Sequence, residues 1–257
     1  MVIEVTRQCL LRCQHCLRGD AEDDGLCYDA EFNIARLLAR HDWCGHLTLS
    51  GGDPFLKPKR ISMIAKRLQG NHISLSGFYI ATSGEFPTYH INDIVSCLLE
   101  LYGMCLDRDE MTCVQFSDDP YREVSKLALE NYETLSGFLK IVDKRNGKIP
   151  NIINEGRAKD LELSKLIARD LYEPEIEIDD GVQVIRPETL YFNVHGECFP
   201  DCDLSYETQS ALNGPSVNDS DFEEQLIDDL MDYHSGRKSV CKASYGEDYE
   251  RQDRVFI

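Results

Sequence analysis

Three cysteines near the N-terminus have a spacing that could support metal chemistry. Cys9, Cys13 and Cys16 fall within eight residues, directly after a short apolar run. A loop of this kind can wrap three thiolates around a small inorganic core. A 4Fe–4S cluster normally takes four cysteines, so three cysteines leave one iron open. An open iron can chelate a small molecule through an amine and a carboxylate together.

Zinc is the alternative occupant of the same thiolates. Structural zinc takes four ligands in a tetrahedron, and His15, Cys27 or His41 could complete a site begun by the three cysteines. The spacing by itself leaves both metals open. Eleven cysteines are many for a chain in a reducing compartment, where clustered cysteines indicate metal binding or catalysis before disulfides. Three others fall on or beside apolar elements and are expected in the core, namely Cys97, Cys105 and Cys113.

The elements that must position these cysteines alternate between short apolar runs and helical stretches. Strands are expected at residues 2–5, 47–49, 73–81 and 112–116, and helices at residues 29–40, 59–68, 91–101 and 121–129. Asp29 is the expected N-cap of the first helix. This alternation predicts a parallel sheet whose functional residues lie at the C-terminal ends of the strands.

The second half of the chain is less regular. Residues 138–142 and 150–153 are candidate fifth and sixth strands, although the roughly seven residues between them are fewer than the dozen that a parallel crossover needs. Helices are expected at residues 161–171 and 221–233. Residues 175–199 alternate around the turn Asp179-Asp180-Gly181, which predicts an antiparallel hairpin. The tail beyond Ser235 is polar and is expected to be loosely held.

Further motifs follow the later strands. Gly51-Gly52-Asp53-Pro54 follows the second strand, Thr82-Ser83-Gly84 follows the third, and Ser117 and Asp118 follow the fourth. Asn154-Glu155-Gly156-Arg157-Ala158 comes after the candidate sixth strand. In this order, and behind the cysteine loop, these motifs resemble those of the radical S-adenosylmethionine (SAM) superfamily over roughly residues 1–160.

The resemblance implies a 4Fe–4S cluster on Cys9, Cys13 and Cys16, with SAM bound beside it. The glycines suit a close approach of the backbone to the amino group of SAM, because a side chain would block it. Asp53 stands where the family has Glu, which keeps the charge and loses one methylene. The residues that the resemblance assigns to SAM binding are His15, Gly51, Gly52, Asp53, Pro54, Thr82, Ser117, Asp118, Asn154, Gly156 and Arg157.

The fold that the resemblance implies is α/β, a partial parallel (β/α)6 TIM-like barrel. The radical SAM core is expected over residues 1–172, and a small α+β extension over residues 173–257. The implied reaction begins when an electron from a donor such as flavodoxin or ferredoxin enters the cluster and cleaves SAM. The resulting 5′-deoxyadenosyl radical then takes a hydrogen atom from the substrate.

A second group of cysteines lies in the expected extension. Cys198 and Cys202 are close in sequence and Cys241 follows. This region is similar to the auxiliary-cluster region, of the SPASM or twitch type, in peptide-modifying radical SAM enzymes. Three cysteines are fewer than the roughly eight ligands that two clusters take. One auxiliary cluster, a zinc site completed by His195 or His234, and three unliganded thiols all stay open.

These C-terminal cysteines decide which substrate is expected first. The leading hypothesis is modification of a peptide or protein, because the similar region belongs to peptide-modifying enzymes. Modification of a nucleotide or another small metabolite is the second hypothesis. A non-catalytic binding module stabilised by zinc is a third, from another functional class.

The charge and hydropathy of the chain exclude several partners. Lys and Arg number 27 and Asp and Glu number 46, which gives a net charge of −19. Duplex nucleic acid is therefore not expected as a partner, since its binding depends on cations that neutralise phosphates. No run of apolar residues is long enough to span a membrane. The first residues lack the pattern of a secretory signal, so a cytoplasmic location is expected.

Overall fold

The computed structural model describes residues 1–106, 113–117, 124–136, 141–143, 152–161, 166–167, 175–179, 182–187, 189–235 and 254–256. Its centre is a mixed sheet of seven strands in the order β11-β10-β1-β2-β3-β4-β5. The strands of this sheet are β1 (Val2–Thr6), β2 (Gly45–Gly51), β3 (Leu75–Thr82), β4 (Cys113–Phe116), β5 (Ile141–Asp143), β10 (Tyr191–Phe192) and β11 (Cys198–Phe199).

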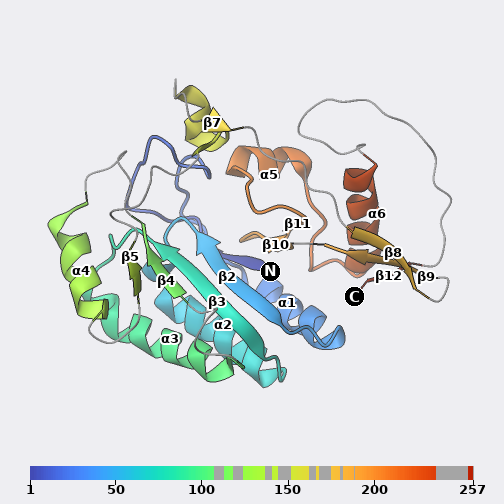
Figure 1. The fold of residues 1–257 in the computed structure, drawn as a ribbon, viewed down its shortest axis with the longest axis horizontal. Coiled ribbons are helices and arrows are strands. Elements are labelled where there is room, and N and C mark those ends of the chain that lie inside the picture. The colour runs from blue at the N-terminus through green and yellow to red at the C-terminus, as the bar shows by residue number, and fades with distance from the viewer. Residues whose placement is uncertain are drawn as a thin grey trace.

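Strands β1 to β5 pair in chain order and are parallel throughout. The sheet is open, because β5 stands at one edge and β11 at the other. One helix follows each of the first four strands, and Figure 1 shows the first three along one face of the sheet. These helices are α1 (Tyr28–Arg40), α2 (Pro58–Gly70), α3 (Ile91–Met104) and α4 (Lys126–Ser136). The predicted α/β class with a parallel sheet is confirmed.

Alternation along β2 and β3 divides the sheet into a core face and an open face. Leu47, Leu49, Phe78 and Ile80 are fully buried in the main hydrophobic core. The residues between them are only half-buried, because successive side chains in a strand point to opposite faces. The open face is therefore available for a site.

The N-cap of α1 is Cys27, whose Sγ accepts a hydrogen bond from the Ala30 N–H. The prediction that Asp29 caps this helix was wrong.

The sixth parallel strand comes from an unexpected part of the chain. The candidate at residues 150–153 contains β6 (Ile152–Ile153), which pairs with β7 (Leu166–Ile167) in a separate two-stranded sheet. The sixth parallel strand is β10, which pairs with β1. Too few residues separate the fifth and sixth candidates for a parallel crossover, and this explains the difference. The helix expected at residues 161–171 is wrong where the structure describes it, because β7 lies there.

The C-terminal part combines a hairpin with two helices. Strands β8 (Glu175–Asp179) and β9 (Val182–Arg186) are antiparallel, as predicted. The third strand of their sheet, β12 (Arg254–Phe256), lies in the tail. Helix α6 (Phe222–His234) agrees with the prediction, and the shorter α5 (Tyr206–Leu212) was not predicted. Residues of both predicted domains share one core and one sheet, and the boundary at residue 172 stays a prediction. No described helix has the length and apolarity to cross a bilayer.

Candidate metal and cofactor site

The three loop cysteines line a single cavity of about 480 Å³. The loop follows β1, and Figure 1 shows it in blue beyond the arrowhead of β2, at the C-terminal ends of the parallel strands. The cavity is lined by Cys9, Leu11, Cys13, His15, Cys16, Leu17, Thr48, Leu49, Ser50, Gly51, Gly52, Tyr79, Ala81, Thr82, Ser83, Ser117, Ile152 and Ile153. The predicted cysteines and the turn after β2 therefore meet at one site.

Local hydrogen bonds shape the cysteine loop. The Leu11 N–H donates to the Cys9 Sγ at 3.4 Å, and the Cys16 N–H donates to the Cys13 carbonyl oxygen at 3.2 Å. A turn follows, in which the Gly19 N–H donates to the Cys16 carbonyl oxygen at 3.3 Å. All three cysteine side chains are half-buried. The loop thus presents its thiols to the cavity while keeping them accessible to a small ligand.

A different set of side chains, Asp201, Cys202 and Asp203, has three possible ligand atoms within 4.8 Å of one another. The loop cysteines share the cavity described above, and both a cluster and zinc stay open as its occupant. Burial raises the pKa of the Cys9 thiol to about 11, with a further contribution from the charges of Asp53, Cys13 and Cys16.

Gly52 lets the turn after β2 pack against the start of the cysteine loop. Its N–H donates to the Thr6 carbonyl oxygen at 2.8 Å, and the Asp53 N–H donates to the Gln8 carbonyl oxygen at 2.7 Å. A Cβ at Gly52 would stand 2.9 Å from the Arg7 carbonyl oxygen and closer still to that of Gln8. The glycine is therefore required by the protein's own backbone, before any ligand is considered.

Asp53 joins the ends of β2 and β3. Its carboxylate is buried and accepts hydrogen bonds from the Thr82 hydroxyl at 3.0 Å, the Ser83 hydroxyl at 2.5 Å and the backbone N–H groups of Ser83 and Phe55. Burial raises its pKa, and these donors oppose that rise. Asp53 is not part of the cavity lining, and neither is Pro54, which begins the 3-10 turn η1 (Pro54–Leu56). Asp53 is placed to organise the cavity wall.

Three of the other predicted residues line the cavity itself. Thr82 and Ser117 stand at the ends of adjacent strands, and the Ser117 N–H donates to the Thr82 carbonyl oxygen at 2.8 Å. His15 lines the cavity from the cysteine loop. Asp118 lies outside the described residues. The ends of β2, β3 and β4 and the cysteine loop thus face a common space, as the parallel sheet predicts.

The Gly156-Arg157 element contacts the cysteine loop from its other side. The Arg157 N–H donates to the Cys16 carbonyl oxygen at 3.0 Å, and its guanidinium donates to Asp20 at 3.1 Å. A Cβ at Gly156 would stand 2.5 Å from the same Cys16 oxygen. Both residues line a separate hollow of about 380 Å³, and Asn154 is exposed outside the cavity lining. The element supports the loop rather than lining the cysteine cavity.

Several lining residues were missed by the sequence analysis. They are the half-buried members of the alternating pattern on the open face and two apolar residues of β6, namely Thr48, Ser50, Tyr79, Ala81, Ile152 and Ile153. The period of two along β2 and β3 was the signal for the first four, because those positions face away from the helices. No local pattern distinguished β6 from a strand of the main sheet.

The C-terminal cysteines occupy different environments. Cys198 is fully buried and belongs to the main hydrophobic core. Cys202 is half-buried and packs against a smaller apolar cluster that contains Phe199. Burial raises the pKa of both thiols, to about 11 for Cys202. Cys241 and the side chain of His234 lie outside the described residues. The two described thiols therefore pack against different groups of residues.

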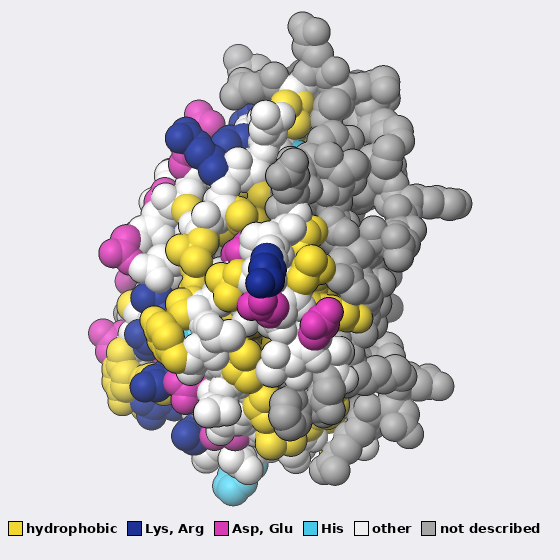
Figure 2. All heavy atoms as spheres, turned by 90° about the vertical axis from the view of Figure 1, so that its left-hand side faces the viewer, with side chains coloured by type: hydrophobic (Ala, Val, Ile, Leu, Met, Phe, Trp, Pro, Cys, Tyr) yellow, Lys and Arg dark blue, Asp and Glu magenta, His cyan; other side chains and the backbone are white. Residues whose placement is uncertain are grey.

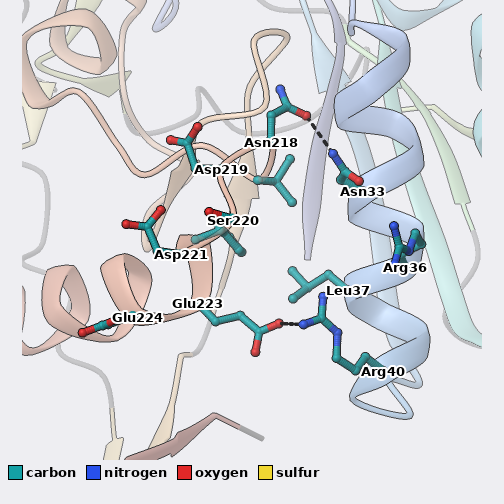
Figure 3. A pocket seen from close by; sticks show the side chains of 12 residues that line it. Asn33, Arg36, Leu37, Arg40, Asn218, Asp219, Ser220, Asp221, Glu223 and Glu224 are labelled. Carbon is teal, nitrogen blue, oxygen red and sulfur yellow. Dashed lines mark hydrogen bonds and ion pairs between the residues drawn. The ribbon is translucent and has the colours of Figure 1, made fainter.

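A second hollow of about 490 Å³ lies between α1 and the start of α6. Figure 3 shows its two walls joined by a hydrogen bond and an ion pair. The Asn33 side chain donates to that of Asn218 at 3.1 Å, and Arg40 pairs with Glu223 at 2.6 Å. Its lining contains no cysteine or histidine. These contacts attach the C-terminal part of the chain to α1.

No family model matches the sequence, and no curated protein matches it. Solved structures that align with the chain include BtrN in complex with AdoMet and 2-DOIA, which is 15% identical, with 92% of this chain and 89% of that chain covered and a TM-score of 0.49. SuiB of Streptococcus suis, bound to the precursor peptide SuiA, is 11% identical over 93% and 66% of the two chains, with a TM-score of 0.39. anSMEcpe with bound AdoMet and Cp18Cys peptide is 11% identical over 91% and 83%, with a TM-score of 0.40.

Proposed function

We propose that this chain is a radical SAM enzyme that holds a 4Fe–4S cluster on Cys9, Cys13 and Cys16. The supporting observation is that these three thiols share one cavity with the turn after β2, at the C-terminal ends of parallel strands. Three thiolates suit a cluster with one iron left for another ligand. When bound, such a cluster supplies the electron that cleaves SAM, and the 5′-deoxyadenosyl radical so formed takes a hydrogen atom from the substrate.

The chain's own residues would bind and orient SAM in the same cavity. The backbone at Gly51 and Gly52 lines the cavity, and the absence of side chains lets it pack against Thr6 and Gln8 at the start of the cysteine loop. Asp53 fixes the hydroxyls of Thr82 and Ser83, so that the wall is organised before a ligand arrives. Apolar side chains from the loop and from β6 would keep water away from reactive species.

Metal analysis tests this proposal. Anaerobically reconstituted protein should hold about four irons and four sulfides per chain. Replacing Cys9, Cys13 and Cys16 together by Ala should abolish both the bound iron and the production of 5′-deoxyadenosine with SAM and dithionite. Cys44→Ala is the control, because Cys44 is exposed and lies outside the cavity. Normal 5′-deoxyadenosine production by the triple variant would refute the proposal, and one zinc per chain without iron would support the zinc-stabilised binding module.

We further propose a nucleotide or small metabolite as the substrate, with a peptide or protein as the second candidate. The peptide hypothesis depends on Cys198 and Cys202 as ligands of one cluster. Cys198 packs in the main core and Cys202 against a separate apolar cluster, which argues against a shared metal. Substrate-dependent release of 5′-deoxyadenosine, measured with nucleotides and with peptides, decides between the two classes. If the variant that lacks Cys9, Cys13 and Cys16 still binds about four irons, an auxiliary cluster is present elsewhere in the chain. The peptide or protein would then again be the first candidate substrate.

The electron donor follows from the same proposal. We propose a small redox protein such as a flavodoxin or a ferredoxin, whose replacement of dithionite in the assay is the test. Duplex nucleic acid is not proposed as a partner. On the described part of the face in Figure 2, basic and acidic side chains are interspersed, whereas a duplex requires a continuous basic surface.

A further inference from the structure

Three buried charges lie on the segments that flank the cysteine loop. Glu4 is fully buried on β1, Arg7 is 3% exposed between β1 and the first cysteine, and Arg18 is 9% exposed two residues after the last cysteine. One carboxylate therefore stands among two guanidinium groups. Charges are rarely buried in proteins, because removing them from water costs several kcal/mol per ion by rough estimate.

Arg18 connects the exit of the cysteine loop to the C-terminal segment. Its Nη1 donates to the Leu204 carbonyl oxygen at 2.6 Å, and its guanidinium carbon lies 4.6 Å from the ring centre of Tyr191. The Arg18 carbonyl oxygen accepts a hydrogen bond from the Tyr206 N–H at 3.0 Å. Both its side chain and its backbone are therefore held by residues that follow it by more than 170 positions.

Arg7 makes the corresponding connection at the entrance of the loop. Its guanidinium donates to Glu4 at 3.3 Å, to Glu22 at 2.8 Å and to the Gln209 side chain at 2.9 Å. It also lies 4.2 Å from the ring centre of Tyr206. Arg7 thus has carboxylates on both sides, and the Glu22 side chain is 43% exposed. Glu4 forms its ion pair with Arg7, and its charge also helps to raise the pKa of Arg18 against the effect of burial.

We propose that Arg18 is a positioning residue for the metal site. It attaches the exit of the cysteine loop to Leu204 and Tyr191 and buries a positive charge on the residue two positions after Cys16. The inference rests on the proposed 4Fe–4S cluster for the effect of the charge, and on the protein alone for the effect on the loop. It assigns the C-terminal segment a role as the support of the N-terminal cysteine loop, through contacts that need no metal of its own.

Charge and geometry can be separated by two substitutions. Arg18→Gln removes the charge, and Arg18→Lys keeps it but loses the planar group that stacks on Tyr191. Arg12→Gln is the matched control, because Arg12 lies beside Cys13 in the same loop and its side chain is 81% exposed. Its ion pair with Asp20, at 3.5 Å, is between exposed groups, and such pairs contribute little to stability. Solvent screens an exposed charge far more than a buried one.

The first measurement uses the metal-free protein. Hydrogen exchange at the backbone N–H groups of Tyr206 and Arg157 reports the contacts that hold the loop exit. Arg18→Gln should speed their exchange about tenfold or more, since a hydrogen bond to a charged group contributes at least that factor to an equilibrium. Arg12→Gln should leave the exchange unchanged. Equal exchange in Arg18→Gln and wild type would overturn the positioning role, whether or not a cluster can be reconstituted.

The second measurement is the midpoint potential of the reconstituted cluster. Reduction adds a negative charge, which a nearby buried cation stabilises, so Arg18→Gln should shift the potential to more negative values. Arg18→Lys should stay close to wild type, and the shift in Arg12→Gln should be much smaller than in Arg18→Gln. A potential unchanged in Arg18→Gln would overturn the role of the charge. If Arg18→Gln does not fold, Arg18→Lys takes its place. Faster amide exchange than wild type together with a wild-type midpoint potential would support the proposal, and any other pair of results would overturn it. Failure of the wild type to bind iron would refute the 4Fe–4S proposal instead, and the exchange result would still judge Arg18.

Discussion

Replacing Gly52 by Ala is the most direct test of how the turn after β2 supports the cysteine loop. An added Cβ would stand 2.9 Å from the Arg7 carbonyl oxygen, 2.5 Å from the Gln8 carbonyl carbon and closer still to the Gln8 oxygen. These are backbone atoms, so no side-chain rotation can relieve the contact. The start of the loop must move, and Cys9 moves with it because it follows Gln8 directly.

The size of the effect follows from the cost of overpacking. Forcing an extra methyl group into a packed interior costs about 1–3 kcal/mol. Each kcal/mol lowers the melting temperature of a chain of this size by about 2–4 °C. Gly52→Ala should therefore melt roughly 2–12 °C below wild type. Displacement of Cys9 should also reduce the iron retained after reconstitution, so iron content and SAM affinity should fall together.

Gly70→Ala is the matched control for this experiment. A Cβ at Gly70, the last residue of α2, would meet no heavy atom within 4 Å. Alanine is favoured over glycine in a helix by about 0.5–1 kcal/mol, so this variant should melt at or above the wild-type temperature. Thermal unfolding by circular dichroism and iron analysis provide the measurements. A Gly52→Ala protein with wild-type melting temperature, iron content and SAM affinity would show that Gly52 does not pack closely against the backbone of Arg7 and Gln8.

Three further predictions concern buried side chains. Asp53→Asn should lower the free energy of unfolding in urea by about 1–3 kcal/mol, because it puts an amide donor among hydroxyl and N–H donors. Because burial raises the Asp53 pKa above 3.8, the folded state binds this proton at higher pH than the unfolded state. The stability of wild type relative to Asp53→Asn should therefore increase as the pH falls toward 3.8 and level off below it; an opposite slope would contradict this. Glu31→Gln should destabilise the protein by about 1–2 kcal/mol in the same urea assay, since its buried carboxylate pairs with Arg60 and Arg67, and an unchanged midpoint would count against those pairs. Iodoacetamide should label the exposed Cys44 in the folded protein and leave the fully buried Cys198 unmodified; rapid labelling of Cys198, detected by mass spectrometry, would contradict its burial.

The sequence by itself determined the elements that depend on short-range patterns. Apolar periodicity located β1 to β4, the first three helices and the hairpin of β8 and β9, because side-chain spacing reflects the period of a helix or a strand. The order of the cysteine loop and the turn Gly51-Gly52 along the chain was sufficient to bring them to one cavity. In a parallel sheet the C-terminal ends of the strands lie at a common edge, so local pattern and chain order together predict that meeting.

Only the tertiary structure decided the contacts between distant segments. Three interactions join residues far apart in sequence. They are the pairing of β10 with β1, the hydrogen bond from Arg18 to the Leu204 carbonyl oxygen, and the hydrogen bond from the Arg157 N–H to the Cys16 carbonyl oxygen. Such pairings depend on how the whole chain packs, and no local period encodes them. The same holds for burial, which assigned Asp53 to the support of the cavity wall and Cys198 to the core. A side chain's chemistry is read from the sequence, but its exposure depends on neighbours that only folding supplies.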